Sequence, residues 1–407
     1  MGGVSMETYK LSDLCEILDA KRKPLSALQR AKKQGIYPYY GAQGIIDHLD
    51  EYLLDGEYLL VAEDGANLET RNQPIANIAK GKIWVNNHAH VLGSNGICPL
   101  NLLGFILNSM NISPYVTGCA QPKLNQENLR NIEIELPSHI DRIASILSSL
   151  DRKIELNNKI NADLEEMAQT IFKNWFVDFE PFKDGKFVDS ELGMIPEGWK
   201  VGSYSEMIES LISGDWGKEN PQGNYTHEVA CVRGCDFQDI NNGVRGKTPQ
   251  RYILEKNYQA KHLKDKDILV EISGGTAIVS TGRTSLVTEE LLKKYKHDIV
   301  CTNFCKVLRP LSQFSSYVYY SWKYKYDNDI MFGYENGTSG IKNFAIKDFI
   351  EKEPVLIPKE QDIVGFQKII DSLQKQKQIK GTENTTLSTL RDTLLPRLMS
   401  GEIEVPE

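Results

Sequence analysis

Apolar side chains recur at alternating steps of three and four residues in two long stretches of this 407-residue chain. Such spacing places them on one face of an α-helix and is typical of a coiled-coil seam. At 1.5 Å per residue, the first stretch would extend over roughly 50 Å. The first seam reads Ile140, Ile143, Leu147, Leu150, Ile154, Asn157, Asn161, Leu164, Ala168, Ile171 and Trp175. The second reads Ile363, Phe366, Ile370, Leu373, Lys377, Lys380, Asn384, Leu387, Arg391, Leu394 and Leu398.

Both seams become polar at their centres. If the two helices pair antiparallel, Asn157 and Asn161 face residues 377–384 of the second helix. A buried polar layer lowers stability but fixes register and orientation. The string KGTENTT over residues 380–386 favours a loosened or broken helix, and Pro396 favours a kink or an end. The alternative is two unrelated surface helices with frayed middles.

The remainder of the chain repeats itself. The string YKLSDLCEIL at Tyr9 resembles WKVGSYSEMI at Trp199, and YLLVAEDG at Tyr58 resembles DILVEISG at Asp267. A proline also stands shortly before each predicted helix. Because these matches follow the same order along the chain, they indicate a duplicated unit whose second copy carries larger loop insertions.

Each globular segment mixes strand-like runs with one short helical run, and Gly and Asn turns punctuate both. The pattern predicts an α+β fold of two similar mixed α/β domains, separated by two long helices that pair as an antiparallel coiled coil with pseudo-two-fold symmetry. We expect the first globular domain over residues 1–137, the central spacer helix over 138–180, the second globular domain over 181–358 and the C-terminal spacer helix over 359–407.

Several strings in combination resemble the specificity subunit of type I restriction-modification systems. They are YPYYGAQGI (37–45), TGCAQPKLNQENLRNIEIELP (117–137), NWFVDFEPF (174–182), GMIPEGWKV (193–201), SGDWGK (213–218) and LRDTLLPRLMSGEI (390–403). The resemblance covers essentially the whole chain. It implies that each globular domain is a target recognition domain for one half of a bipartite double-stranded DNA site, with the helices setting the spacing. It also implies two methyltransferase subunits and motor-nuclease subunits as partners in phage defence, and no catalysis by this chain.

Bulk composition changes this picture little. The formal net charge of −8 argues mildly against a nucleic-acid binder on overall charge. A local basic face can still act, because the Debye length is only about 8 Å at physiological salt. The seven cysteines are sparse and odd in number, which fits a reduced cytoplasmic protein. The sequence lacks an apolar run long enough for a membrane span.

Reading DNA sequence requires donors and acceptors on loops, with Arg and Lys on phosphates. Each Arg or Lys can equally be a solvated surface charge, and Tyr39 and Tyr40 can equally pack in the core. Residues 233–251 carry four basic residues and are the best candidate for base reading in the second half-site. Candidates in the first domain are Lys21, Arg22, Lys23, Tyr37, Tyr39, Tyr40, Gln43, Asn67, Arg71, Asn87, His88 and Lys123. Those in the second are Trp216, Lys218, Arg233, Arg245, Lys247, Thr248, Arg251, Arg283, Asn303 and Lys342.

Motifs for catalysis are missing from the sequence. The chain has no Asn/Asp-Pro-Pro-Tyr/Phe run for an amino-methyltransferase, and NNGVRGKT has Asn241 where a phosphate loop needs its first glycine. We therefore expect no catalytic residues, no cofactor and no enzyme activity in the chain itself. Two rival hypotheses remain: a single-chain nuclease or methyltransferase with attached recognition domains, and a coiled-coil protein-interaction scaffold without DNA readout.

Two groups of residues resemble metal ligands. Cys231, Cys235, Cys301 and Cys305 form two C-x3-C pairs, a spacing that permits zinc, although C-x2-C is more usual. Both pairs lie in strand-like text, which favours small buried residues. The HAH string at His88 has no further ligands at metal spacing, so we expect no metal site.

Overall fold

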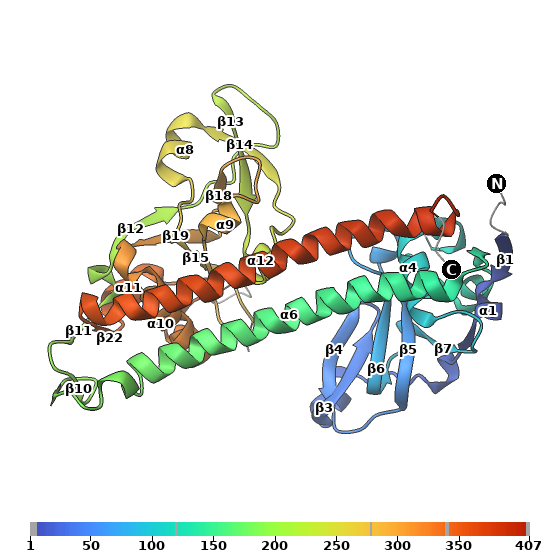
Figure 1. Cartoon of the computed structure of the whole chain (residues 1–407), viewed down its shortest axis with the longest axis horizontal. Helices are drawn as coiled ribbons and strands as arrows, with labels where there is room; N and C mark the ends of the chain where they lie inside the picture. Colours follow the sequence, from blue (N-terminus) through green and yellow to red (C-terminus); the bar gives the residue numbers. More distant parts are fainter. Residues whose placement is uncertain (1–5, 119–120, 277–278, 338–341, 404–407) are drawn as a thin grey trace. The chain divides into compact units, whose positions relative to one another are not determined.

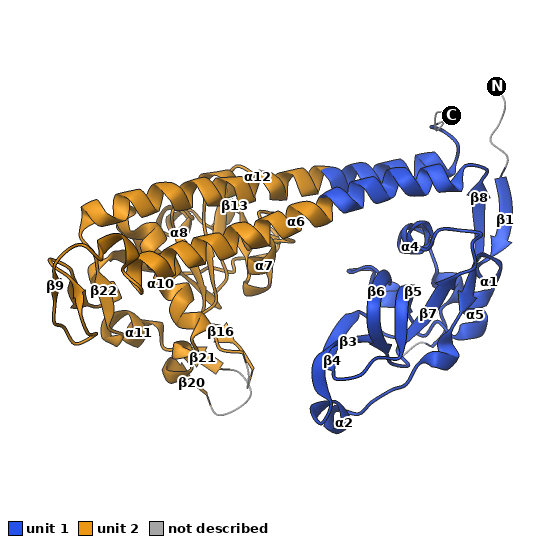
Figure 2. Cartoon of the chain, turned by 60° about the horizontal axis from the view of Figure 1, so that its bottom comes forward, with its two compact units in different colours: residues 1–153, 387–407 blue, residues 154–386 orange. Residues whose placement is uncertain are grey.

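The computed structural model describes residues 6–118, 121–276, 279–337 and 342–403. The chain divides into two compact units, which Figure 2 colours separately. Unit 1 comprises Met1–Lys153 and Leu387–Glu407, and unit 2 comprises Ile154–Thr386. Each unit is mixed α/β and contains a part of both long helices, α6 (Ile140–Phe176) and α12 (Glu360–Met399).

Short strands and helices make up the globular part of each unit. Unit 1 has the strands β1 (Met6–Lys10), β2 (Cys15–Ile17), β3 (Gln34–Gly41), β4 (Gly44–Leu49), β5 (Leu54–Ala62), β6 (Ala76–Val85), β7 (Ala89–Ser94) and β8 (Glu133–Pro137), and the helices α1 (Leu11–Leu14), α2 (Ala27–Ala31), α3 (Asn67–Thr70), α4 (Leu100–Ser109) and α5 (Gln126–Arg130). Unit 2 has the strands β9 (Phe187–Val188), β10 (Ile195–Pro196), β11 (Lys200–Gly202), β12 (Ile208–Ser213), β13 (Tyr225–Val232), β14 (Gln250–Leu254), β15 (Ile268–Glu271), β16 (Ser273–Gly274), β17 (Thr284–Leu286), β18 (Ile299–Cys301), β19 (Cys305–Pro310), β20 (Glu335–Asn336), β21 (Lys342–Phe344) and β22 (Val355–Ile357), and the helices α7 (Phe237–Asn241), α8 (Glu255–Lys261), α9 (Glu289–Leu292), α10 (Ser315–Asp327) and α11 (Ile346–Lys352).

The two units share part of their strand order. The sheet of unit 1 runs β2-β7-β5-β6-β3-β4, whereas unit 2 has one sheet β12-β19-β15-β17 and a separate sheet β14-β13-β18. In both units an early strand pairs antiparallel with the last strand before a long helix, β1 with β8 and β11 with β22. A helix follows β7 and β19 in the same way, as α4 and α10. The repeat in the sequence therefore corresponds to a repeated topology.

The sheets and helices of each unit enclose an apolar core. In unit 1, α4 buries Leu103 and Leu107 in the same core cluster as Leu59 of β5. In unit 2, α10 buries Val318 and Trp322 together with Ile268 of β15. Removing such side chains from water is worth about 1.5–3 kcal/mol each. These clusters make the sheets rigid supports for the loops at their ends.

Parts of α6 and α12 pack against each other inside each unit, antiparallel in direction (Figure 1). In unit 1, Ile143 and Leu147 share a core with Leu398. In unit 2, Phe176 near the end of α6 packs on Phe366 near the start of α12, with ring centroids 4.9 Å apart. The predicted seam residues are all buried or half-buried: Ile143, Leu147, Leu150, Ile154, Asn157, Asn161, Leu164, Ile171, Phe366, Ile370, Leu373, Leu387 and Leu394.

The polar centres of the two helices meet within unit 2. The Asn157 side chain donates a hydrogen bond to Asn384 Oδ1 at 2.9 Å. Lys377 Nζ lies 2.5 Å from Glu165 Oε2, and the Lys377 side chain is only 4% exposed. Burial raises the pKa of the Glu165 carboxyl, but the Lys377 ammonium outweighs this effect and holds the pKa below its usual value. The Glu165 carboxylate is therefore favoured over its protonated form inside the seam.

The expected break in the second helix is wrong. α12 is continuous through residues 380–386, and Pro396 lies inside it rather than at its end. Position 381 requires glycine because the backbone of Gly243 passes close to the helix at this point. A Cβ on Gly381 would lie 2.0 Å from the Gly243 carbonyl oxygen. Pro396 cannot donate the helical hydrogen bond to the Asp392 carbonyl, and α12 nevertheless continues to Met399. In the described ranges, no helix has both the length and the apolar character that crossing a membrane would require.

The turn after α7 is anchored on both long helices of unit 2. Asn161 of α6 donates a hydrogen bond to the Asn242 carbonyl at 2.9 Å. Lys294 Nζ donates to the Gly243 carbonyl and, at 3.0 Å, to the Gln378 carbonyl of α12. Gly243 has φ +75°, and a Cβ there would meet the Lys377 carbonyl oxygen at 2.4 Å. Asn161 thus anchors a loop of the globular part, in addition to its place in the seam.

Candidate nucleic-acid interface

The predicted DNA contacts differ widely in accessibility. Half of them lie on the surface and can meet a ligand directly. The exposed residues are Lys21, Lys23, Gln43, Asn87, His88, Lys123, Trp216, Lys218, Arg245, Lys247 and Asn303. Half-buried are Arg22, Tyr37, Tyr40, Arg71, Arg233, Thr248, Arg283 and Lys342. Buried are Tyr39, Asn67 and Arg251.

Several of these residues serve the fold of unit 1 instead. The Tyr39 hydroxyl accepts the Leu25 N–H at 2.9 Å, so Tyr39 is a core residue. Both polar atoms of the Asn67 amide bond the backbone of Gln73. Arg71 donates to three carbonyls at the end of α4, including that of Leu107 at 2.8 Å. As a correction, we leave these three predicted residues out of the proposed contacts.

Unit 2 has an open cavity of about 410 Å³ at the ends of its strands. Its wall includes Trp216 after β12, Arg233 after β13 and Glu271 at the end of β15. Residues 302–304, which we call turn B, connect β18 to β19 and complete the wall. Phe304 in turn B is 66% exposed. An exposed aromatic ring thus forms part of the cavity wall.

Carboxylates hold the guanidinium groups around this cavity. Arg233 binds Asp236 through Nε at 3.1 Å and Nη2 at 3.0 Å. Arg283 binds both oxygens of Glu271 at 2.8 Å. These hydrogen bonds raise the pKa of both guanidinium groups. Side chains fixed in this way lose little conformational entropy on binding a ligand.

Trp216 and Arg251 form a second fixed pair beside the cavity. The Arg251 guanidinium lies 3.8 Å from the centroid of the Trp216 ring. Arg251 is buried and pairs with Glu219 at 3.1 Å. It therefore orients Trp216 and is not itself placed to contact a phosphate. Lys342, also a predicted contact, pairs with Glu335 at 2.7 Å.

The basic loop that precedes β14 projects from another part of unit 2. Arg245 is exposed and lies over the Tyr295 ring, 5.6 Å from its centroid. The Tyr295 hydroxyl donates to the Arg245 carbonyl, and the Lys247 carbonyl accepts from Arg233 at 2.9 Å. Burial raises the pKa of Tyr295 to about 12, so this hydroxyl stays a neutral donor. The loop backbone is thus fixed while its cationic side chains face solvent.

The equivalent strand ends of unit 1 carry a closed polar network. His90 is fully buried, with Nδ1 2.6 Å from Asp19 Oδ2. Arg22 pairs with both Asp19 and Glu63, and Lys123 pairs with Glu63 at 3.1 Å. Burial raises the pKa of the Asp19 carboxyl, but the hydrogen bond from His90 and the nearby cations outweigh it and hold the pKa below its usual value.

This network is also the single cluster with metal-ligand geometry among the described residues. Asp19, Glu63 and His90 each offer one ligand atom within 4.8 Å of the others. Arg22 and Lys123 already neutralise the two carboxylates, so a divalent cation would meet added positive charge. The network therefore fits a structural role.

The cysteines of unit 2 are strand or turn residues. Cys231, Cys301 and Cys305 are buried, and Cys235 is exposed. Burial raises the pKa of the Cys231 and Cys305 thiols to about 12. Zinc binds the thiolate form of cysteine, and the raised pKa of these two thiols favours their protonated form instead.

A family model described as "Type I restriction modification DNA specificity domain" matches residues 3–166. The MjaIX type I restriction enzyme specificity subunit of Methanocaldococcus jannaschii is 28% identical over 375 residues, covering 86% of this chain and 80% of the relative. The HindI specificity subunit of Haemophilus influenzae is 24% identical, covering 96% and 91%. By these comparisons the chain is similar to the specificity subunits of type I restriction-modification systems.

The fold of this chain also resembles that of a solved structure. The S subunit of a type I restriction-modification system from M. genitalium superposes with a TM-score of 0.52. The superposition covers 100% of this chain and 98% of that chain, at 16% identity. At this level of identity the likeness concerns the fold alone.

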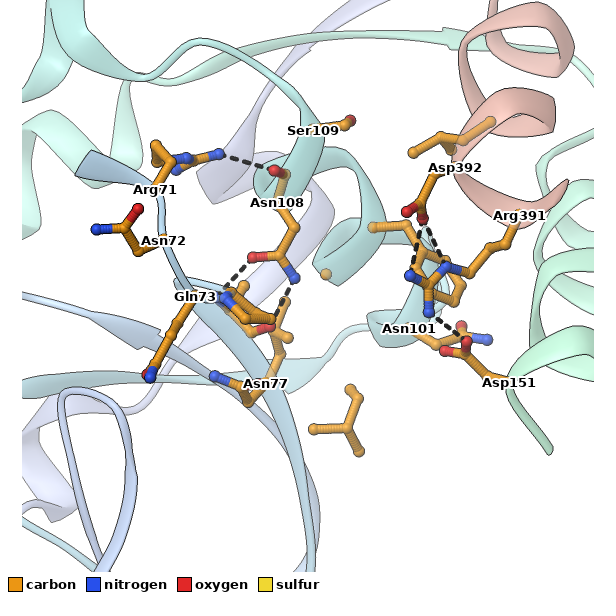
Figure 3. Close-up of a pocket in the computed structure, with 17 residues that line it drawn as sticks. Arg71, Asn72, Gln73, Asn77, Asn101, Asn108, Ser109, Asp151, Arg391 and Asp392 are labelled. Carbon is orange, nitrogen blue, oxygen red and sulfur yellow. Dashed lines mark hydrogen bonds and ion pairs between the residues drawn. The ribbon is translucent and has the colours of Figure 1, made fainter. Parts of the chain in front are cut away.

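A further cavity of about 600 Å³ lies within unit 1. Its walls come from α4, the start of β6 and the long helices (Figure 3). There the Arg391 guanidinium lies between Asp151, at 2.6 Å, and Asp392, at 2.8 Å. The Arg391 charge is thus paired with carboxylates, whereas Arg71, which also lines this cavity, donates to backbone carbonyls.

The sequence did not single out several residues that define the open cavity. Phe304, Glu271 and Thr302 line it, yet none belonged to the predicted contacts. Phe304 lies in the apolar, strand-like string DIVCTNFC, which favoured buried residues. Its exposure follows from turn B, and Asn303 beside it is a residue type common in turns.

Proposed function

We propose that this chain is the DNA-sequence specificity subunit of a type I restriction-modification complex and reads a bipartite double-stranded target. Each globular part would act as a target recognition domain for one half-site. The supporting observation is the repeated topology: two similar strand frames, each leading through an antiparallel strand pair into one long helix. Two copies of one frame suit two half-sites of one target.

The proposed contacts are the exposed polar side chains at the strand ends and loops. In the first recognition domain these are Lys21, Lys23, Gln43, Asn87, His88 and Lys123. In the second they are Trp216, Lys218, Arg245, Lys247 and Asn303, with Arg233 on the cavity wall and Arg283 bound to the wall residue Glu271. Lysines and arginines on loops suit phosphates, and amides suit base edges.

The proposal extends to the assembly and the cell compartment. The long helices would set the half-site spacing in a pseudo-two-fold arrangement and dock two methyltransferase subunits, which motor-nuclease subunits join in the cytoplasm. The chain would contribute recognition and no chemical step. This assignment explains why Asn161, Lys294 and Gln378 tie a loop of the second domain to the helices.

Modified-base sequencing tests the proposal. Genomic DNA from cells that carry this chain and its cognate methyltransferase subunit is compared with DNA from cells lacking only this chain. We expect one split motif with methylated adenines to disappear with the chain. If the complex assembles and no motif changes, the chain acts as an interaction scaffold and the DNA assignment fails.

A further inference from the structure

Two short turns occupy the same position in the repeated frames. Residues 86–88, which we call turn A, connect β6 to β7 in unit 1, and turn B connects β18 to β19 in unit 2. The N–H of Asn86 bonds the Tyr40 carbonyl of β3, and the N–H of Thr302 bonds the Val232 carbonyl of β13. Each turn is therefore tied to the parallel strand beside it.

The tips of the two turns are held by matching hydrogen bonds. The N–H of His88 bonds Asn86 Oδ1 at 2.7 Å, and the N–H of Phe304 bonds Thr302 Oγ1 at 3.3 Å. The His88 carbonyl accepts the N–H of Glu63, and the Phe304 carbonyl accepts that of Ile272, both at 2.9 Å. By this backbone pattern, His88 and Phe304 are equivalent residues on rigid turns.

Both tips carry exposed side chains, although His88 Nδ1 lies 2.7 Å from Asp64 Oδ2. Asn87 and Asn303 stand at equivalent positions, and both are exposed. Within the described parts of the chain, neither side-chain amide has a hydrogen-bond partner. Phe304 is 66% exposed beside the cavity that contains the fixed guanidinium of Arg233. A large exposed aromatic residue on a rigid turn costs solubility, so a contact with a partner is the simplest reason for it.

We infer that turn B reads an A·T base pair in the second half-site and that turn A reads the first half-site. This inference rests on the proposed DNA-recognition function and assigns base readout within it. The Asn303 amide would bind adenine N6 and N7, and Phe304 would contact the thymine methyl group in the major groove. The cavity behind Phe304 gives the base edge room, and Asn87 and His88 take the corresponding positions on turn A.

The test uses the full chain assembled with its methyltransferase subunits. Phe304→Ala and Asn303→Ala are compared with His88→Ala and Asn87→Ala, and Leu311→Ala, also an exposed apolar residue of unit 2, serves as control. Modified-base sequencing reads both halves of the methylated motif. We expect the turn B variants to relax one position of one half only, the turn A variants to relax the other half only, and Leu311→Ala to leave the motif unchanged.

A binding experiment checks the base assignment directly. For the unmodified complex, uracil in place of thymine at the relaxed position should weaken target binding about tenfold, because only the methyl group is lost. The Phe304→Ala complex should bind both DNAs equally, with unchanged affinity for unrelated DNA. A variant that loses target and unrelated DNA alike contradicts the inference, as does a second half-site without an A·T pair.

The outcomes separate this inference from the proposed function. If the motif depends on the chain but the turn variants leave both halves unchanged, turn readout is wrong and DNA recognition stands. If no motif depends on the chain, the proposed function itself fails.

Discussion

Equivalent strand ends of the two units carry different side chains. In unit 1, His90 is completely buried against Asp19, at the end of β2. In unit 2, the equivalent residue of β19 is Lys306, which is half-buried and donates to Ser213 at 2.6 Å, at the end of β12. The first site is a closed network of charges, and the second borders on open space.

The strand registers show that this is a true equivalence. His90 pairs with Val61 of β5, and Lys306 pairs with Val270 of β15. The backbone frame therefore tolerates either a buried network or a half-buried lysine. The difference teaches that the residues at the strand ends can change while the core beneath them stays the same, as the proposed recognition of two different half-sites would require.

Asp19→Ala should give the largest loss of unfolding free energy at these strand ends. Removing this carboxylate leaves His90 and Arg22 without their buried partner, and breaking a buried ion pair in this way costs about 3 kcal/mol. Ser213→Ala, the matched change in unit 2, should cost less than about 0.5 kcal/mol. Denaturant unfolding of the two variants measures both values, and equal losses would contradict the contrast.

Gly381→Ala tests the anchored turn, which belongs to unit 2. In an unobstructed helix this change stabilises by up to about 1 kcal/mol. Here the added Cβ would overlap the Gly243 carbonyl, so we expect destabilisation of about 2 kcal/mol. Gly365→Ala is the control in the same helix, because its Cβ meets only the Trp175 ring at 3.2 Å. A gain in unfolding free energy for both variants would refute the anchoring.

Low pH should remove the stabilisation that the carboxylates at the strand ends of unit 1 provide. The pKa values of Asp19 and Glu63 are lowered in the folded state, so these carboxylates stabilise unit 1 above their unfolded pKa values of about 4. That contribution is lost as pH falls below about 4, through the folded pKa values. The Asp19→Asn variant should lose less stability than the unmodified chain between pH 7 and pH 3. Denaturant midpoints at the two pH values check this, and identical losses would argue against it.

Arg245→Ala combined with Lys247→Ala should have the smallest effect. Loss of two phosphate contacts would weaken DNA binding of the assembled complex at low salt and reduce the salt slope by about 1.8. The exposed lysines Lys183 and Lys186, replaced together by alanine, provide a charge-matched control. Fluorescence titration across salt concentrations measures both, and an unchanged slope would remove the loop from the interface.

The sequence predicted the repeat and the long helices because both rest on regular patterns. The 3,4 spacing around Ile143 and Phe366 needs only local periodicity, and the seam residues lie where that pattern places them. The continuity of α12 was missed because Gly381 is explained by the distant Gly243 backbone. Among the predicted DNA contacts, the partners of Arg71 and Arg251 are likewise long-range. A single residue type cannot reveal whether an arginine meets a carbonyl, a carboxylate or solvent.

The anchored turn at Gly243 has a consequence for exchanging recognition domains between systems. Its receptor is made of Asn161 on one helix and of Gln378 and Gly381 on the other. A second domain transplanted into a foreign pair of helices would bring the turn and Lys294 but leave this receptor behind. Chimaeras joined at the helix boundaries would therefore need these three helix residues grafted together with the second domain.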